Sequence, residues 1–239
     1  GVESESTAKD TVLTDIEAAD VYSYASDQLA DLVRAGALAA LDDVSEVLTK
    51  AGKTLDDVKS ANAPDSIEAA SLDGKMYGFP TGGANTYFLY YDSSVVSEED
   101  AKSWDSLLAA ANKGKKKVGM TLNSGWYNAS FFYGAGFTTG LNQDGTTTMD
   151  WNGTSADGIK GVDVVKSMLD ITSNPAFMPV PDGQISNAIA SGDLCAVISG
   201  AWDSSNAEKV WGDGYSATKL PTYKLGAKDI QMAPAYGYK

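Results

Sequence analysis

The stretch GDLCAVISGAWD, residues 192–203, constrains the fold more than any other part of the chain. Its short apolar run, bounded by Gly192 and Gly200, predicts a buried strand. Trp202 and Asp203 follow almost directly. Neither a tight turn nor the start of a helix needs an indole, so Trp202 either packs in the core or contacts a ligand. We favour the ligand, because the strand before it already supplies the core residues.

Strands and helices alternate along the rest of the chain. Residues 20–25 are typical of a strand that leads through a very short turn into a helix ending at Gly36. A Tyr- and Phe-rich strand follows Gly82-Gly83, and residues 103–114 have the cap and spacing of a helix. This alternation indicates an α/β fold with a mostly parallel or mixed sheet.

Three local patterns predict smaller elements. Asp73-Gly74 predicts a β-hairpin turn, and NQDGTTTMDWNG at residues 142–153 predicts a second small hairpin. The stretch after Thr154 or Ser155, either of which can cap a helix, has helical periodicity. That helix is expected to bury Ile159, Val162, Val165, Met168 and Leu169.

Charge and residue counts exclude several functions. The 32 acidic and 18 basic residues give a net charge of −14, which repels nucleic acids and anionic membranes. Histidine is absent, which removes the commonest metal ligand and general base, so we expect no metal and no cofactor. Cys195 lies inside the apolar run and is expected to be a small buried side chain. The sequence has no apolar run of the ~18 residues that a membrane-spanning helix needs.

Enzyme signatures are missing from the sequence. It contains no GxSxG elbow, no Walker A sequence and no GxGxxG between a strand and a helix. A glycosidase needs only two suitably spaced carboxylates, but no pair stands out among the many Asp and Glu residues. We therefore expect that the protein is not an enzyme.

The candidate site residues are aromatic and polar side chains near strand ends and helix starts. Ligands of open α/β sheets collect at the carboxyl ends of the strands. Flat aromatic faces cover the apolar face of a sugar, while carboxylates and amides bind its hydroxyls. The pattern predicts sugar binding by Tyr24, Asp27, Asn85, Trp126, Tyr127, Trp202 and Asp203. The structural alternatives are a half-buried strand residue for Tyr24, a helix cap for Asp27, a turn residue for Asn85 and core packing for Trp126.

The motifs DGKMYGFP, FLYYD, GDLCAVISGAWD and LPTY follow one another along almost the whole chain. In this order they resemble extracellular solute-binding proteins of sugar ABC transporters, the family that includes the maltodextrin-binding proteins. The resemblance implies a two-lobed α/β fold of the type II periplasmic-binding-protein kind, which closes over an oligosaccharide.

The resemblance also implies a division of the chain. Residues 1–85 match part of an N-lobe, residues 86–225 match a C-lobe, and residues 226–239 match a segment that crosses back toward the N-lobe. Family members begin before the first matching region and continue past the last. We therefore expect this chain to be the middle portion of a longer protein, with an incomplete N-lobe.

The resemblance also extends to individual residues of the candidate site. Tyr24 matches an aromatic side chain of the N-lobe cleft, and Asp27 matches a carboxylate that binds sugar hydroxyls. Trp126 and Trp202 match aromatic platforms of the C-lobe. Gln28 stands where the maltodextrin-binding proteins have an Arg, and GGANTY lacks the Glu that they carry after the proline turn. These departures reduce charged recognition of the sugar.

The expected function is an extracellular receptor that binds maltose, maltodextrin or another oligosaccharide and delivers it to the membrane permease of an ABC transporter. The family implies that it is a membrane-anchored lipoprotein or lies in the periplasm. Two other classes stay open at this point. One is an extracellular carbohydrate-active enzyme with an unrecognised carboxylate pair, and the other is a surface adhesion module.

Overall fold

The structure is a computed structural model that describes residues 8–15, 17, 19–82, 85–142 and 146–238. The chain divides into two compact units. Unit 1 comprises residues 1–85 and 236–239, and unit 2 comprises residues 86–235. The chain therefore leaves unit 1 after Asn85 and returns to it at Tyr236.

Unit 1 contains short helices and a small hairpin. The helices are α1 (Ala8–Thr14), α2 (Leu29–Arg34), α3 (Ser45–Lys50), α4 (Leu55–Ser60) and α5 (Pro64–Ala69). The hairpin pairs β1 (Ser71–Leu72) with β2 (Lys75–Met76). Its turn residues Asp73 and Gly74 have φ values of 51° and 80°, the left-handed backbone that a two-residue hairpin turn requires. The predicted hairpin is therefore confirmed.

Residues 20–25 form a strand in the prediction but not in the structure. Residues 22–25 have an open backbone that pairs with no other strand among the described residues. A single 3-10 turn, η1 (Ser26–Gln28), then leads into α2, and Gly36 follows that helix with a left-handed φ of 68°. Alternating residues favour an extended chain, but a strand also needs a neighbour whose peptide groups bond to it.

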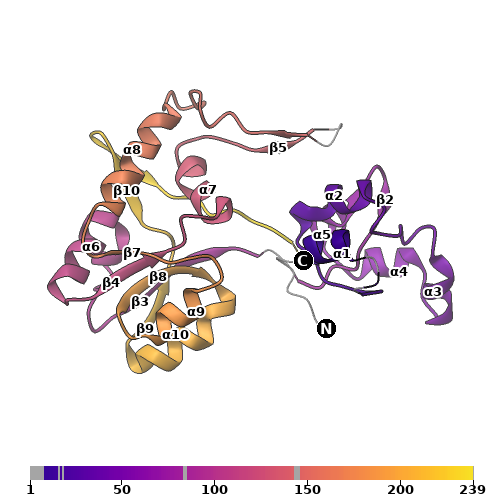
Figure 1. Cartoon of the computed structure of the whole chain (residues 1–239), viewed down its shortest axis with the longest axis horizontal. Coiled ribbons are helices and arrows are strands. Elements are labelled where there is room, and N and C mark those ends of the chain that lie inside the picture. The colour runs from indigo at the N-terminus through magenta and orange to yellow at the C-terminus, as the bar shows by residue number, and fades with distance from the viewer. Residues whose placement is uncertain (1–7, 16, 18, 83–84, 143–145, 239) are drawn as a thin grey trace. The chain divides into compact units, whose positions relative to one another are not determined.

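Unit 2 is built on a mixed sheet with the strand order β7-β4-β8-β3-β9 (Figure 1). Its strands are β3 (Tyr87–Asp92), β4 (Lys117–Met120), β7 (Phe177–Pro179), β8 (Leu194–Gly200) and β9 (Tyr215–Thr218). Strands β4, β7 and β8 are parallel, whereas β3 runs antiparallel to both of its neighbours, β8 and β9. All seven residues of β8 are buried, which confirms the buried strand in GDLCAVISGAWD.

Helices cover both faces of this sheet. α9 and α10 pack together on one side, and α6, α7 and α8 lie on the other (Figure 1). Their bounds are α6 (Trp104–Lys113), α7 (Gly125–Gly134), α8 (Gly161–Thr172), α9 (Ile185–Ala190) and α10 (Ser204–Trp211), with the 3-10 turns η2 (Asp100–Lys102), η3 (Ala201–Asp203) and η4 (Gly212–Gly214). α6 confirms the predicted caps: the Ser103 hydroxyl accepts the Ser106 amide at 3.2 Å, and Gly114 follows the last turn.

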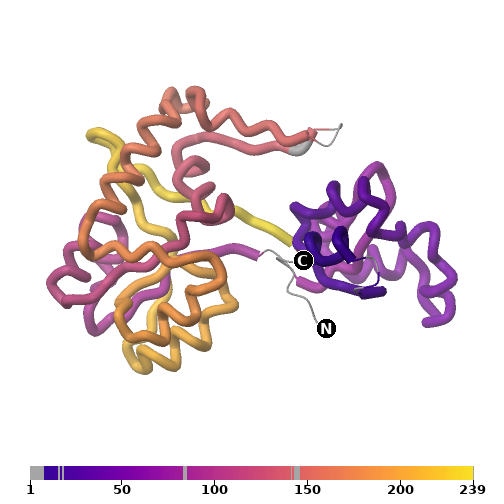
Figure 2. The backbone as a smooth tube through the Cα atoms, viewed as in Figure 1, coloured from indigo at the N-terminus to yellow at the C-terminus, as the bar shows by residue number. Residues whose placement is uncertain are grey.

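Two hairpins complete unit 2. β5 (Gly140–Leu141) pairs with β6 (Thr147–Thr148), so the second predicted hairpin exists but begins two residues earlier and ends before residues 149–153. Residues 143–145 lie outside the described residues, as do Gly83 and Ala84. β10 (Thr222–Leu225) pairs with β11 (Lys228–Gln231), drawn in yellow in Figure 2. Residues 226–235, predicted to cross back, therefore belong to unit 2.

The burial predicted for helix α8 is confirmed in part: Ile159 is buried and Met168 packs partly buried against the core, whereas the rest of the predicted face is exposed. The helix also begins later than predicted, at Gly161 rather than after Thr154 or Ser155.

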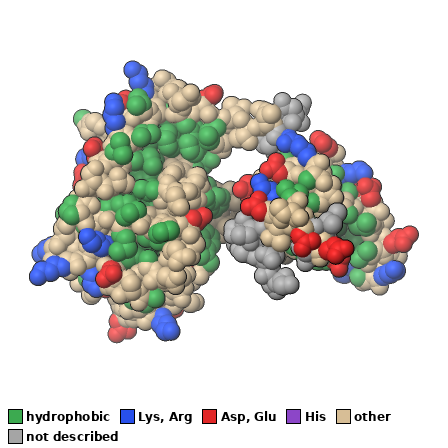
Figure 3. All heavy atoms as spheres, viewed as in Figure 1, with side chains coloured by type: hydrophobic (Ala, Val, Ile, Leu, Met, Phe, Trp, Pro, Cys, Tyr) green, Lys and Arg blue, Asp and Glu red, His purple; other side chains and the backbone are tan. Residues whose placement is uncertain are grey.

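The side chains of Val162, Val165 and Leu169 are 55%, 43% and 59% exposed, and hydrophobic side chains gather on the face of unit 2 near α7 and α8 in Figure 3. Val164 and Ile171 are buried instead, where α8 packs against β7 and β10. Both faces carry apolar residues at helical spacing, so periodicity alone could not choose between them.

A pair of matched substitutions in α8 tests this assignment. Val164→Ala should lower the unfolding free energy by about 1.5–3 kcal/mol, because Val164 is fully buried. Val162→Ala, the same change at an exposed position, should alter it by less than about 0.5 kcal/mol. All five tryptophans lie in unit 2, so urea unfolding followed by tryptophan fluorescence reports on this unit. Equal effects at the two positions would contradict the assignment.

Candidate functional site

The candidate site in unit 2 lies at the carboxyl edge of its parallel strands. α7, which carries Trp126, follows the end of β4, and η3, which carries Trp202, follows the end of β8. Because β4 and β8 are parallel, both ends reach the same edge of the sheet. Tyr87 is at this edge too, since β3 is antiparallel and Tyr87 pairs with Gly200. The fold thus brings Trp126 and Trp202 to one edge, and Tyr87 lies at the same edge on β3, the neighbour of β8 on the side away from β4.

Trp202 is held against the backbone that precedes it. A Cβ atom at Gly200 would overlap the Trp202 ring, so glycine is the residue that allows this packing. The Tyr90 hydroxyl donates to the Gly200 carbonyl oxygen at 2.9 Å and fixes the same peptide. The Trp202 side chain is still 45% exposed. An indole with one supported face and an exposed remainder is suited to stack on a ligand.

Trp126 is half-buried and is fixed through its backbone. The Tyr87 hydroxyl donates to the Trp126 carbonyl oxygen at 2.7 Å, and the two rings meet edge to face with centroids 5.6 Å apart. In the loop before α7, the Asn128 side-chain amide donates to the Leu122 carbonyl at 2.8 Å. The start of α7 therefore has a defined position at the edge of the sheet.

Tyr127 differs from the prediction, because it supports the site from inside. Its side chain is 5% exposed, and its ring lies 5.0 Å from that of Tyr87. Burial raises the pKa of Tyr127 to about 12, and burial likewise raises the pKa of Tyr87 to about 12. A buried neutral phenol cannot stack on a ligand in this arrangement.

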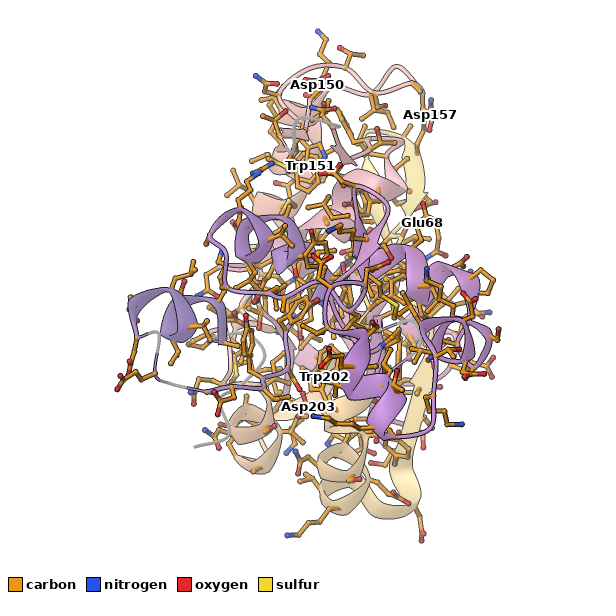
Figure 4. The ribbon with its side chains drawn as sticks, turned by 90° about the vertical axis from the view of Figure 1, so that its right-hand side faces the viewer. Glu68, Asp150, Trp151, Asp157, Trp202 and Asp203 are labelled. Atoms are coloured by element: carbon orange, nitrogen blue, oxygen red, sulfur yellow. The ribbon has the colours of Figure 1, made fainter. Side chains whose placement is uncertain are left out.

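Asp203 also differs from the prediction. It is 1% exposed and accepts hydrogen bonds from the hydroxyls of Ser186 at 2.5 Å and Ser199 at 2.6 Å. Figure 4 shows Asp203 next to Trp202. A carboxylate buried in this way binds its own unit, so it is not available to sugar hydroxyls.

In unit 1, Tyr24 lines a groove of about 690 Å³ whose walls are mostly apolar. Burial, together with the nearby Tyr22, raises the pKa of Tyr24 to about 12. The Tyr24 hydroxyl lies close to Gly78, where a Cβ atom would be 2.7 Å from it. Tyr24 is therefore half-buried within unit 1, as the structural alternative has it, although not in a strand, and part of the ring is accessible.

Asp27 and Asn85 flank the returning C-terminal segment of unit 1. Asp27 is exposed in η1, and the amide of the preceding Ser26 donates to the Tyr238 carbonyl at 3.0 Å. Asn85 exchanges backbone hydrogen bonds of 2.6 Å and 2.9 Å with Gly237. Their side-chain roles in ligand binding stay predictions.

Two polar residues at the edge of unit 2 were missed by sequence reasoning. Asn123 and Asp182 are exposed and follow β4 and β7, and the Asp182 amide donates to the Asn123 side-chain oxygen at 3.2 Å. Their amide and carboxylate oxygens are groups that bind sugar hydroxyls. The available signal was their position after a strand, which is weak without knowing that the strands are parallel neighbours.

Two further features of the described residues concern metal ions and membranes. No cluster of three or more Cys, Asp or Glu residues in that part of the chain is arranged to hold a metal ion. None of the helices there has the length and apolarity needed to cross a membrane.

Comparison with protein families gives a match over nearly the whole chain. The model described as "Bacterial extracellular solute-binding protein" matches residues 2–239. A galactooligosaccharide-binding protein of Bacillus subtilis is 27% identical over 195 residues, which are 77% of this chain and 45% of that protein. This chain therefore spans about half the length of that relative.

This chain is also similar to solved structures of sugar-binding proteins, and it again covers only part of their length. A structure solved with acarbose is 31% identical, with a TM-score of 0.75 over 99% of this chain and 58% of that one. A maltodextrin-binding protein from L. casei is 29% identical, with a TM-score of 0.67 over the same shares. A maltotriose-binding protein of Thermus thermophilus, 18% identical with a TM-score of 0.74, supports the fold. The α/β fold is thus that of two-lobed, maltose-binding-protein-like periplasmic binding proteins.

Gly200→Ala tests how Trp202 is held. The added methyl group should push the indole off the backbone and change the tryptophan emission spectrum and near-UV circular dichroism. Gly140→Ala is the control, because a Cβ atom there has no neighbour within 4 Å. If both variants keep the parent spectra, Trp202 does not pack on Gly200.

The buried tyrosines predict a loss of stability at alkaline pH. The ordinary pKa of tyrosine is ~10, and the folded unit raises that of Tyr127 to about 12. The folded state therefore favours the neutral phenol, and this stabilisation is complete below pH ~10 and is lost as the pH rises toward ~12. Urea unfolding across this range should show a smaller pH dependence for Tyr127→Phe. An unchanged slope in that variant would contradict the assignment.

Proposed function

This chain belongs to the bacterial extracellular solute-binding protein family, and we propose that it forms the receptor for a neutral oligosaccharide that an ABC transporter permease takes up. The observation that carries the proposal is the half-exposed Trp202 ring, fixed against Gly200 at the carboxyl edge of the sheet. Trp126 at the same edge offers a second ring. Two rings at one edge fit a chain of sugar units better than a single small solute.

Stacking and hydrogen bonding together account for sugar selectivity in this proposal. An aromatic ring covers the C–H face of a pyranose, which a polar side chain cannot do without losing its own hydration. Asn123 and Asp182 supply exposed oxygens for the hydroxyls. Lys and Arg side chains are absent from this set, which favours a ligand without charge.

Maltodextrin is the first ligand class to test. The similar structures solved with acarbose and from a maltodextrin-binding protein are 31% and 29% identical to this chain, which supports an α-linked glucose oligomer. The 27% identical galactooligosaccharide-binding protein supports galactosides as the second class. We infer a location outside the cytoplasmic membrane, with anchoring through lipid as in lipoproteins.

The proposal is a binding function without turnover. Proteins that this chain resembles are named for binding, and the buried Asp203 removes one carboxylate from any pair at the edge of unit 2. Incubation with maltotriose and galactotriose should return the sugars intact. Continuous release of shorter products would contradict the receptor proposal and favour a carbohydrate-active enzyme.

A pair of tryptophan variants tests the binding role. Trp202→Ala should weaken maltotriose binding by about 1–3 kcal/mol, the scale of a lost stacking contact, and leave the stability of unit 2 nearly unchanged. Trp151→Ala should lower the stability of unit 2 and leave maltotriose binding nearly unchanged. Trp151 stacks on Phe132 with centroids 4.4 Å apart and lies well above Trp202 in the view of Figure 4.

Calorimetric titration measures the affinities and urea unfolding measures the stabilities of these two variants. If Trp202→Ala unfolds the unit, Trp202 is a core residue and the site assignment is wrong. If the parent chain gives no heat with maltotriose, acarbose or galactotriose, the oligosaccharide proposal fails for this chain.

A further inference from the structure

We propose that Asp203 is a positioning residue, which fixes the turn that presents Trp202 and does not itself touch the ligand. The effect of Asp203 on ligand affinity rests on the proposed function, whereas its effect on the position of Trp202 does not. The sequence placed Asp203 among the ligand-binding residues, and the structure gives it a different environment.

The Asp203 carboxylate joins three elements of unit 2. One oxygen, Oδ1, accepts the Ser186 hydroxyl at 2.5 Å and the Asn206 amide at 3.4 Å. The other, Oδ2, accepts the Ser199 hydroxyl at 2.6 Å. Ser186 belongs to α9, Ser199 to β8 and Asn206 to α10. A single side chain thus fixes the relative positions of a strand and the two helices on its flank.

A carboxylate suits this position better than any other side chain of its size. Each of its oxygens receives a hydroxyl, whereas an amide in its place has one acceptor oxygen and would leave a hydroxyl facing an NH₂ group. The charge lies at the N-terminus of α10, where the helix dipole favours it. The ion pairs found among the described residues do not include Asp203, so its role is not that of a salt bridge.

The same turn carries Trp202. η3 spans Ala201–Asp203, and it is further held by the Tyr90 hydroxyl on the Gly200 carbonyl and by the Ser204 hydroxyl on the Ala201 carbonyl, both at 2.9 Å. With both ends of the turn fixed, the indole rests on Gly200. Loss of the carboxylate frees one end of the turn, and the ring is then no longer confined to this position.

Confining the ring before binding raises affinity, because the ligand does not have to order it. Asp203 therefore acts on the ligand only through Trp202. This separates it from Asn123 and Asp182, which are exposed residues that a sugar can contact directly.

The first test follows Trp202 without any ligand. The emission of Trp202 is obtained by subtracting the spectrum of the matching Trp202→Phe protein. In Asp203→Asn, acrylamide should quench this emission more strongly than it does in the parent chain. Val164→Ala is the control, since it destabilises the same unit at a buried position on α8. The proposal is overturned if Trp202 is quenched to the same extent in Asp203→Asn as in the parent chain or in Val164→Ala.

Ser186→Ala provides a milder version of this test. It removes one donor to Asp203 and should raise the quenching in the same direction, so the proposal stays testable if Asp203→Asn does not fold. An unchanged quenching in a folded Ser186→Ala protein would then overturn it.

The second test is a double-mutant cycle with maltotriose. Asp203→Asn should weaken binding about tenfold in the parent chain and less than about twofold in the Trp202→Ala background, because its effect passes through the ring. Equal losses in both backgrounds would mean that Asp203 contacts the sugar, which contradicts a positioning role. If the parent chain binds none of maltotriose, acarbose and galactotriose, the proposed function fails, and the quenching experiment alone decides the role of Asp203.

Discussion

Burial of β8 at the centre of its sheet is the constraint on which the rest of unit 2 depends. All seven of its residues are buried, with β4 bonded along one side and β3 along the other. A strand covered on both faces needs helices on both, which α6 to α10 supply. The parallel pairing of β8 with β4 then brings the segments that follow them to one edge, and this is why Trp126 and Trp202 share it. The candidate site is thus a consequence of how the core is covered.

The edge of unit 2 combines partly exposed rings with buried groups that hold them. Tyr87 fixes Trp126 through its carbonyl, Tyr90 fixes Gly200 below Trp202, and Asp203 ties the turn to α9 and α10. These supports are buried, so a ligand bound at this edge as proposed would meet the rings and not the groups that position them. Preorganisation of this kind is what a receptor needs when stacking, rather than charge, supplies the affinity.

The sequence predicted the α/β class, the buried strand, the hairpin at Asp73-Gly74 and the capped helix at 103–114, because each rests on a local pattern. The sequence prediction failed where packing between elements decides which side chains are buried. Val162 and Val164 both fit a helical stripe, and only the contacts with β7 and β10 select Val164 for the core. Likewise, Trp202 and Asp203 are neighbours in sequence but separate into an exposed ring and a buried carboxylate. The residues Asn123 and Asp182 could be found only once β4 and β7 were known to lie side by side.

The most direct measurement is an NMR titration of the five indole N–H groups with maltotriose, each assigned by its Trp→Phe variant. The indoles of Trp104, Trp151 and Trp211 donate to partners inside unit 2. The account predicts that the signals of Trp202 and Trp126 shift on titration and that those three stay in place. Shifts at Trp151 or Trp211 with a silent Trp202 would contradict the central claim that the ring at the end of β8 contacts the sugar.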